Sequence, residues 1–472
     1  MLVVVLGGLR AARYLALGPD AATRHERLFD LRRDASHPYL TALKYVHTGR
    51  IERPYSPHPE TRRPFGYSVF LSWFLAHISE SRTITVVLAS IWGVLTSLIV
   101  FLVVLRTVGQ GRPYESAAAA LVAGAFPYNL QLSVTGAMEP AFSLLYAVTM
   151  ALVVRIVTTT ERRVPSWLPL AAGTALGLAV WTRGNALMLP VAGFALTFLL
   201  WRRGRPCWGR VGMFVTIPMV MSIGLQILAL HAIAGRYTLP SIGVDTTAHY
   251  LVHAAAEWKR TGSLAEGNKL GNWFGENYQL RYLGGGEDDE TLLDEARQRM
   301  WDGLRAAPLY VFAKFVLNWA EVAEVGIFSG SKWEKYLSTN LVLATLSLFG
   351  ACVLAGLPGA AVIAVFWLVV GAGAACTTGQ RYRVFAHSEL MLAYTWVAVP
   401  LLWRRRADYL RIALTLGAGL APVAAFFVLR GGWGSLSFAL SRFTALYLLL
   451  LGLSLITVGM LRVFFGRAPA SR

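Results

Sequence analysis

Two long uncharged stretches constrain the fold of this chain more than any other feature. Residues 84–105 contain no Asp, Glu, Lys or Arg, and residues 208–232 contain only Arg210 over a similar length. An α-helix rises about 1.5 Å per residue, so roughly 20 apolar residues cross the ~30 Å hydrocarbon core of a bilayer. Both stretches therefore predict transmembrane helices, because a buried helix of a soluble protein is usually shorter.

The composition extends this prediction to the whole chain. Apolar residues make up 55% of the 472 residues, charged residues make up 15%, and the mean hydropathy is +0.50. Water-soluble domains average about 45–50% apolar and about 25% charged residues. We therefore predict an all-α polytopic membrane protein, in which transmembrane helices form essentially the whole fold.

The apolar segments predict about twelve transmembrane helices, within a range of about 11–13. They lie near residues 1–18, 84–105, 114–130, 137–157, 167–182, 186–201, 208–233, 337–356, 359–376, 385–403, 409–429 and 438–463. The first is cleanly apolar only before Arg10 and Arg13. Because a Sec signal peptide has a basic start and a small-residue cleavage site, we expect a shortened first span instead.

The net charge of +18 follows the predicted topology. Basic residues cluster in short loops that fall on one side when the spans alternate, and the positive-inside rule makes that side the cytoplasm. The clusters are Arg106, Arg112, Arg155, Arg162, Arg163, Arg202, Arg203, Arg205, Arg210, Arg404, Arg405, Arg406, Arg411 and the tail residues Arg462, Arg467 and Arg472. No nucleic-acid partner is expected, since these residues do not follow one polar face. The high Ala, Arg and Gly content indicates a GC-rich bacterial genome, hence a bacterial plasma membrane.

Two long polar segments fall on the exoplasmic side, at residues 19–83 and 234–336. The chain thus divides into three parts. Residues 1–233 form an N-terminal transmembrane module that includes the first polar segment, residues 234–336 form the second polar segment, and residues 337–472 form C-terminal transmembrane helices. The chain shows no internal repeat, which weighs against a transporter of two duplicated halves.

Both polar segments carry helical patterns. In the first, Asp34 stands where a helix can begin, apolar side chains recur at helical spacing from Tyr39, and Gly49 ends the pattern. In the second, residues 288–304 open with acidic side chains that favour a helix N-terminus. Residues 308–325 suit a helix lying in the membrane interface.

Three acidic residues near the exoplasmic ends of spans are candidates for chemistry, because charges at the membrane are costly and by default functional. Asp34 and Asp30 follow the first span, where a partly desolvated carboxylate can act as a general base. The structural alternatives are a helix cap for Asp34 and a solvated charge for Asp30. Glu139 begins a span, either as a functional group or as ordinary first-turn chemistry.

Basic residues on the exoplasmic side depart from the positive-inside pattern. Arg183 is an isolated cation between two apolar stretches, suited to binding phosphate or to snorkelling to the interface. Arg381 and Arg383 flank Tyr382, where guanidinium groups suit bidentate contact with a specific phosphate or with lipid headgroups. We interpret the nearby His387 as an interfacial histidine with satisfied hydrogen bonds.

No disulfide framework or zinc site is indicated. Cys207, Cys352 and Cys376 lie far apart without paired spacing, so we expect them to be packing residues.

Taken in order, these fragments resemble the GT-C glycosyltransferases that use polyprenyl-phosphate-linked sugars. The likeness is to the branch containing the protein O-mannosyltransferases and the lipid A aminoarabinose transferase. In that family an acid follows the first span, a Tyr-Leu-x-x-Ala-like helix ends in Gly, and a proline-rich stretch leads into an aromatic helix. Here Tyr39 to Gly49 and then residues 53–74 (RPYSPHPETRRPFGYSVFLSWF) follow that order.

Three later segments resemble the family's Glu-bearing fourth span, its Arg-after-span motif and its RYRxPxxP motif, here without the prolines. They are residues 138–155 (MEPAFSLLYAVTMALVVR), 177–190 (GLAVWTRGNALMLP) and 381–390 (RYRVFAHSEL). The family acid usually lies four residues before the tyrosine, where this chain has Ala35 and Asp34 stands one place earlier. Asp34 and Asp30 therefore both remain candidates for the base.

The resemblance implies an inverting sugar transfer at the exoplasmic or periplasmic face. Asp34 would deprotonate the acceptor, while Arg183 and Arg381 would neutralise the departing lipid phosphate. The substrate-binding residues it implies are Tyr39, Glu139, Arg183, Arg381, Tyr382 and Arg383. The donor lipid would lie in a groove between helices beside membrane lipids, and the acceptor would be a glycan, a lipid or a protein. No cofactor is firmly implied; some relatives use a divalent metal, but no His/Asp cluster here supports one.

Two other function classes fit the span number. One is a transporter or flippase, which would show broken helices in corresponding halves and charges near the middle of the bilayer. The other is a non-catalytic GT-C-like scaffold, which the displaced position of Asp34 leaves open.

Overall fold

The structure of this multi-pass membrane protein, a computed structural model, describes two main ranges of the chain. These are residues 2–17 and residues 31–261, the latter with gaps at 55–56, 62, 109–112, 126, 137, 159–163, 184–207, 236, 238 and 241. Isolated positions between 266 and 305 are also described. The predicted span at 186–201, the interfacial helix at 308–325 and every span from 337 onward lie outside the described residues.

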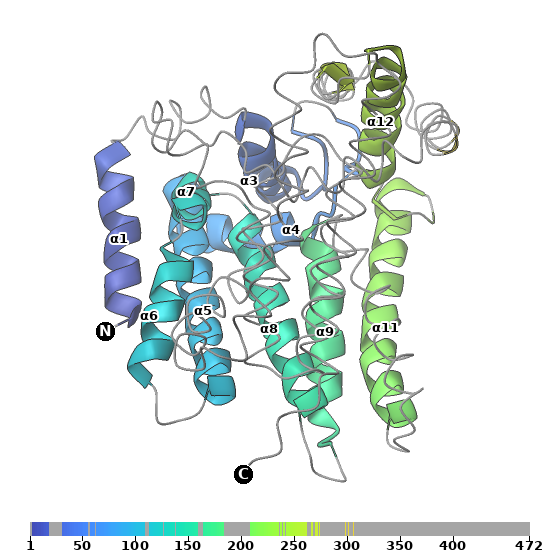
Figure 1. Ribbon diagram of the computed structural model, residues 1–472. Helices are drawn as coiled ribbons and strands as arrows, with labels where there is room; N and C mark the ends of the chain where they lie inside the picture. Colours follow the sequence, from blue (N-terminus) through green and yellow to red (C-terminus); the bar gives the residue numbers. More distant parts are fainter. Residues whose placement is uncertain are drawn as a thin grey trace.

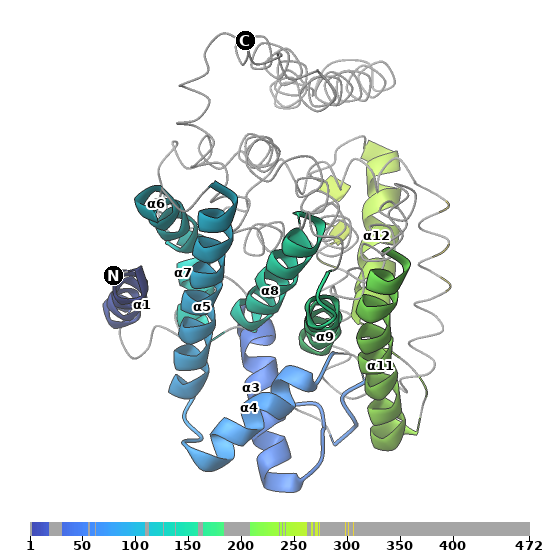
Figure 2. The same ribbon diagram turned by 90° about the horizontal axis from the view of Figure 1, so that it is seen from below.

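A row of upright helices forms the body of the described structure. It consists of α1 (Leu2–Leu17), α5 (Thr83–Val108), α8 (Glu139–Thr158), α9 (Trp167–Thr182) and α11 (Trp208–Ala234). Both views show them in the order α1, α5, α8, α9, α11 across the molecule (Figures 1 and 2), and each packs on the next. Three of them contain a stretch long and apolar enough to cross a membrane, at Thr83–Arg106, Glu139–Ile156 and Gly212–Ala234, and α9 is a shorter apolar helix. These helices agree with the spans predicted at 84–105, 137–157, 167–182 and 208–233.

The single span predicted at 114–130 is wrong. The structure divides this segment into α6 (Pro113–Gly124) and α7 (Pro127–Thr135). Pro127 lacks an N–H and disfavours a helical conformation at the residue before it, which favours a break in the helix at this point. The side chain of Asn129 donates a hydrogen bond to the Ala123 carbonyl oxygen at 3.1 Å, which satisfies an acceptor at the end of α6.

Three helices gather at the end where α8 begins and α9 ends (Figure 1): α3 (Leu31–Thr48), α4 (Gly66–His77) and α12 (Ile242–Thr261). The basic last turns of α5 and α8, which hold Arg106 and Arg155, lie at the opposite end. The predicted stop of α3 is confirmed, because Gly49 adopts φ +69° and donates its N–H to the Tyr45 carbonyl oxygen at 2.9 Å.

A cluster of buried side chains fixes α3 and α4 on the ends of α5 and α8. Its buried members are Ala42, Tyr67, Leu71, Leu75, Leu88, Met138 and Ala141. They come from all four helices and from the residue before α8, so α3 and α4 form one packed unit with the starts of α5 and α8.

Arg10 attaches α1 to this body through a buried polar contact. The residue is 1% exposed. Its guanidinium donates hydrogen bonds to Ser133 Oγ of α7 and to the Gly124 carbonyl oxygen of α6, each at 3.2 Å. A Cβ on Gly93 of α5 would lie 2.8 Å from Arg10 Nη2, so this glycine makes the room for the guanidinium. Arg10 therefore lies within α1, and its buried hydrogen bonds allow the helix to continue past it to Leu17.

Glycines bring α9 and α11 into backbone contact. A Cβ added at Gly173 would lie 2.2 Å from the Val215 carbonyl oxygen, and one at Gly177 would lie 2.4 Å from Ser222 Cβ. Small residues at such crossings allow the close approach on which helix association in membranes depends. The Trp181 indole N–H donates to the Ser222 carbonyl oxygen at 2.8 Å near the outer end of this contact.

We predict that Gly173→Ala lowers the unfolding free energy by about 1–3 kcal/mol, because the new methyl group must push α11 away from α9. Gly224→Ala on α11 is the matched control, since a Cβ there meets nothing within 4 Å. Thermal unfolding of the detergent-solubilised protein measures both. Equal melting temperatures for the two variants would contradict the close contact.

Candidate functional site

Glu139 and Arg183 form a buried ion pair at the end of the bundle covered by α3 and α4. Glu139 is the first residue of α8, and Arg183 follows the last residue of α9. Arg183 Nη1 lies 3.2 Å from Glu139 Oε1, and the two side chains are 4% and 1% exposed. The sequence predicted each residue separately but not their pairing. Arg183 is thus held inside the protein and does not snorkel to the interface.

Aromatic side chains surround this pair. The Arg183 guanidinium carbon lies 6.0 Å from the centroid of the Phe142 ring. Phe65, at the entry to α4, packs edge-on against Trp181 with ring centroids 5.7 Å apart. A Cβ on Gly66 would lie 2.7 Å from the Trp181 carbonyl oxygen, so α4 begins in close contact with the end of α9. The pair consequently lies in a low-dielectric surrounding, where electrostatic interactions are stronger than in water.

Tyr67, in the first turn of α4, is buried beside this ion pair. It belongs to the same buried cluster as Ala42 of α3, Met138, which directly precedes Glu139, and Ala141 of α8. Burial raises the pKa of the Tyr67 phenol, and the charge of Glu139 raises it further. Tyr67 therefore presents a neutral hydroxyl next to a buried carboxylate.

A second buried pair joins α3 to the loop before α4. His37 Nε2 lies 2.8 Å from Glu60 Oε2, with side chains 6% and 1% exposed. The backbone N–H of Arg63 donates to Glu60 Oε1 at 2.8 Å. Burial by itself would raise the pKa of the Glu60 carboxyl, but His37, this N–H and the Arg63 guanidinium lower it to about 2. Glu60 is therefore a fixed anion that holds the loop on α3.

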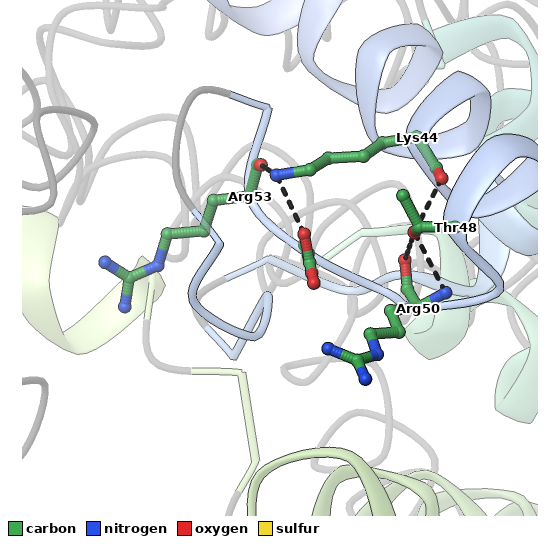
Figure 3. A network of polar contacts seen from close by, with 5 residues as sticks. Lys44, Thr48, Arg50 and Arg53 are labelled. Atoms are coloured by element: carbon green, nitrogen blue, oxygen red, sulfur yellow. Dashed lines mark hydrogen bonds and ion pairs between the residues drawn. The ribbon is translucent and has the colours of Figure 1, made fainter.

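Lys44 anchors the other side of the same loop (Figure 3). Its Nζ lies 2.9 Å from Glu52 Oε2 and donates to the Arg53 carbonyl oxygen at 3.1 Å. Thr48 Oγ1 accepts the Arg50 N–H at 3.2 Å, which holds the chain as it leaves α3. The loop returns on itself, because Glu60 donates its N–H to the Ile51 carbonyl oxygen at 3.1 Å.

The other predicted site residues divide into three groups. Asp34 lies in α3, one helical turn before His37, and its side chain is outside the described residues. Tyr39 donates its hydroxyl to the Glu80 carbonyl oxygen at 2.8 Å, a contact that ties α3 to the turn before α5. Asp30, Arg381, Tyr382, Arg383 and His387 lie outside the described residues.

Sequence reasoning missed His37, Glu60 and Tyr67. His37 follows Asp34 by three residues and precedes Thr41 by four, so a polar face on α3 was visible in the sequence. This polar face does not indicate which residue pairs with His37, because Glu60 lies in the loop after the helix. Within the described ranges, no group of three or more His, Cys, Asp or Glu side chains is placed to hold a metal ion.

Glu60→Gln should lower the unfolding free energy near pH 7 by about 3 kcal/mol, the value of a pKa shift from 4.5 to about 2. Because the folded-state pKa is lowered, this stabilisation is complete above pH 4.5 and is lost as the pH falls through about 2. Melting temperatures of wild type and variant should therefore converge over that interval.

Glu80→Gln is the matched control. His47 Nε2 lies 3.5 Å from Glu80 Oε2, but the two side chains are 56% and 55% exposed, and such pairs contribute little. A Glu60→Gln effect no larger than that of Glu80→Gln would show that the buried pair does not hold the loop.

Comparison with known proteins finds a similarity to one family over much of this site. Residues 62–252 match the family described as dolichyl-phosphate-mannose-protein mannosyltransferase. The match begins just before α4, ends within α12, and includes Tyr67, Glu139 and Arg183. No curated protein matches the chain.

Two solved structures from Archaeoglobus fulgidus are similar to this chain. The apo crystal structure of its oligosaccharyltransferase is 13% identical with a TM-score of 0.47, over 97% of this chain and 55% of that one. The oligosaccharyltransferase AglB in complex with an inhibitory peptide and a dolichol-phosphate is 16% identical with a TM-score of 0.43, over 91% and 51%. The chain spans about half the length of these proteins, and at these scores the likeness carries no argument about its activity.

Residues 62–252 of this multi-pass membrane protein are therefore similar to the dolichyl-phosphate-mannose-protein mannosyltransferase family, which agrees with the GT-C resemblance that the sequence predicts.

Proposed function

We propose that this protein is a membrane glycosyltransferase that moves a sugar from a polyprenyl-phosphate-linked donor to an acceptor. The observation that carries the proposal is the position of the buried Glu139–Arg183 pair inside the region similar to that family. The pair lies at the same end of the bundle as α3, the helix in which Asp34 stands. A base and a phosphate-binding cation are the two groups that this reaction needs.

The reaction is a displacement at the anomeric carbon of the sugar. An acceptor oxygen or nitrogen forms the new bond, the bond from the anomeric carbon to the phosphate oxygen breaks, and the phosphate leaves with the electron pair. Attack opposite the leaving group inverts the configuration at that carbon. Asp34, or Asp30 in its place, takes the proton from the acceptor. The phosphate is a weak base, so it needs charge stabilisation more than a proton.

Arg183 supplies that stabilisation, together with Arg381. The Glu139 carboxylate holds the Arg183 guanidinium in a fixed place within a buried surrounding, so little reorganisation is needed when charge develops on the phosphate. Tyr382 and Arg383 adjoin Arg381 in the sequence and extend the same phosphate site. The chemistry of this site does not require a metal ion.

The two sides of the bundle serve different substrates. The donor lipid stays in the bilayer between helices, while α3, α4 and α12 shape the acceptor pocket at the exoplasmic end. We assign that end to the exterior of a bacterial plasma membrane, since the basic turns at Arg106 and Arg155 occupy the other end. The acceptor is a glycan, a lipid or a protein.

Transfer of radiolabelled sugar from a panel of polyprenyl-phosphate sugars tests the proposal. We expect transfer by membranes carrying the wild type and a loss of about 10²–10⁴-fold in Asp34→Asn, the range for removal of a general base. Asp30→Asn is the companion variant, and loss in that variant alone would move the base to Asp30. Absence of transfer by wild type from every donor, while a known relative works in parallel, would contradict the proposal.

A further inference from the structure

Two neutral side chains, one on α4 and one on α11, are buried with unsatisfied polar atoms. Tyr67 is 3% exposed and Gln226 is fully buried. In the part of the chain that the structure describes, the Tyr67 hydroxyl and both polar atoms of the Gln226 carboxamide have no hydrogen-bond partner. Leaving a buried polar group unsatisfied costs about 1–3 kcal/mol, so each such group in a native protein needs an explanation.

The two side chains come from different helices that both pack against α9. Tyr67 follows the Phe65–Gly66 turn that packs on Trp181 at the end of α9. Ser222 of α11 faces α9 at the same level, because its carbonyl oxygen accepts the Trp181 indole N–H. Gln226 lies one helical turn beyond Ser222 on the same face of α11, toward the end where Arg183 follows α9.

The chemistry of these groups matches sugar hydroxyls. A hydroxyl and a carboxamide both donate and accept hydrogen bonds, and they carry no charge. Sugar hydroxyls also donate and accept, and a nearby carboxylate such as Glu139 accepts from them. A phosphate would instead be matched by cations, and Arg183 already supplies one at this place.

We propose that Tyr67 and Gln226, beside Glu139, form the subsite for the sugar ring of the donor. The subsite rests on the proposed function, since it presumes a phosphate-linked sugar whose phosphate lies at Arg183. The sugar then occupies the next position along the donor, between the phosphate and the acceptor. The unsatisfied atoms of the free protein obtain their hydrogen bonds when the donor binds.

The proposed subsite predicts that Tyr67→Phe weakens donor binding without lowering the stability of the free protein. Removing a hydroxyl that has no partner should leave the melting temperature of the free protein unchanged or raise it, because a desolvation cost disappears. The same variant should bind the sugar-bearing donor about tenfold more weakly, the value of roughly one hydrogen bond. Gln226→Met removes the carboxamide with similar length and should behave alike.

The experiment measures ligand-induced thermal stabilisation of the detergent-solubilised full chain. The two probes are the polyprenyl-phosphate sugar that wild type uses best and the same polyprenyl phosphate without sugar. Wild type should be stabilised more by the sugar-bearing probe. Tyr67→Phe and Gln226→Met should lose that difference and keep the stabilisation by polyprenyl phosphate. Tyr114→Phe, at a residue 85% exposed near the start of α6, is the matched control and should keep both.

Two results would overturn the subsite. In the first, both variants transfer sugar normally and are stabilised more by the sugar-bearing probe than by polyprenyl phosphate, to the same extent as wild type. The proposed function would then stand, but Tyr67 and Gln226 would not form the sugar subsite. In the second, the ligand-free variants melt at a lower temperature than wild type and bind both probes more weakly. That result would show that Tyr67 and Gln226 have a structural role. If wild type transfers no sugar and neither probe stabilises it, the proposed function fails, and the subsite fails with it.

Discussion

A carboxylate and a guanidinium buried at the edge of a membrane must be paired, and the Glu139–Arg183 contact meets that condition between two neighbouring helices. Separating the two residues would leave an uncompensated buried charge, which typically costs about 3–5 kcal/mol. The contact therefore fixes the start of α8 against the end of α9. Phe65 packs on Trp181 at the same end of α9, and Tyr67 shares a buried cluster with Met138, so α4 lies against this alignment.

Paired charges hold the loop between α3 and α4 in place. His37 with Glu60 and Lys44 with Glu52 hold the loop from α3 to α4 at two separate points. A site built on helices that are fixed in this way keeps its geometry better than one built on a free loop. The first turn of α3, which contains Asp34, is thereby part of an element docked on the membrane bundle.

Sequence patterns predicted the local features of this fold and left its long-range pairings open. The spans at 84–105 and 208–233 follow from continuous apolar stretches, and the end of α3 at Gly49 follows from turn chemistry. The break between α6 and α7 was missed because the apolar pattern continues through Pro127, where the structure ends one helix and begins another. Arg10 interrupts the first apolar run of the sequence, and its partner Ser133, which accounts for its burial, lies 123 residues away.

In the candidate site, too, the sequence indicated individual residues but not the contacts between them. Glu139 and Arg183 were identified because isolated charges beside apolar spans are unusual, but nothing in either motif indicates that they meet. Glu60 and Tyr67 belong to the proline-rich stretch that resembles the family pattern, yet their burial depends on α3 and α8. Roles that depend on contacts between distant segments could be assigned only from the structure.

The most direct test of the account is to locate the donor on the protein. A photoreactive short-chain polyprenyl-phosphate sugar, added outside sealed right-side-out vesicles, would be crosslinked and its adducts mapped by mass spectrometry. The account predicts adducts in α4 and in the adjoining ends of α8 and α9, all displaced by unlabelled donor. Displaceable adducts confined to the opposite end, near Arg106 and Arg155, would contradict it.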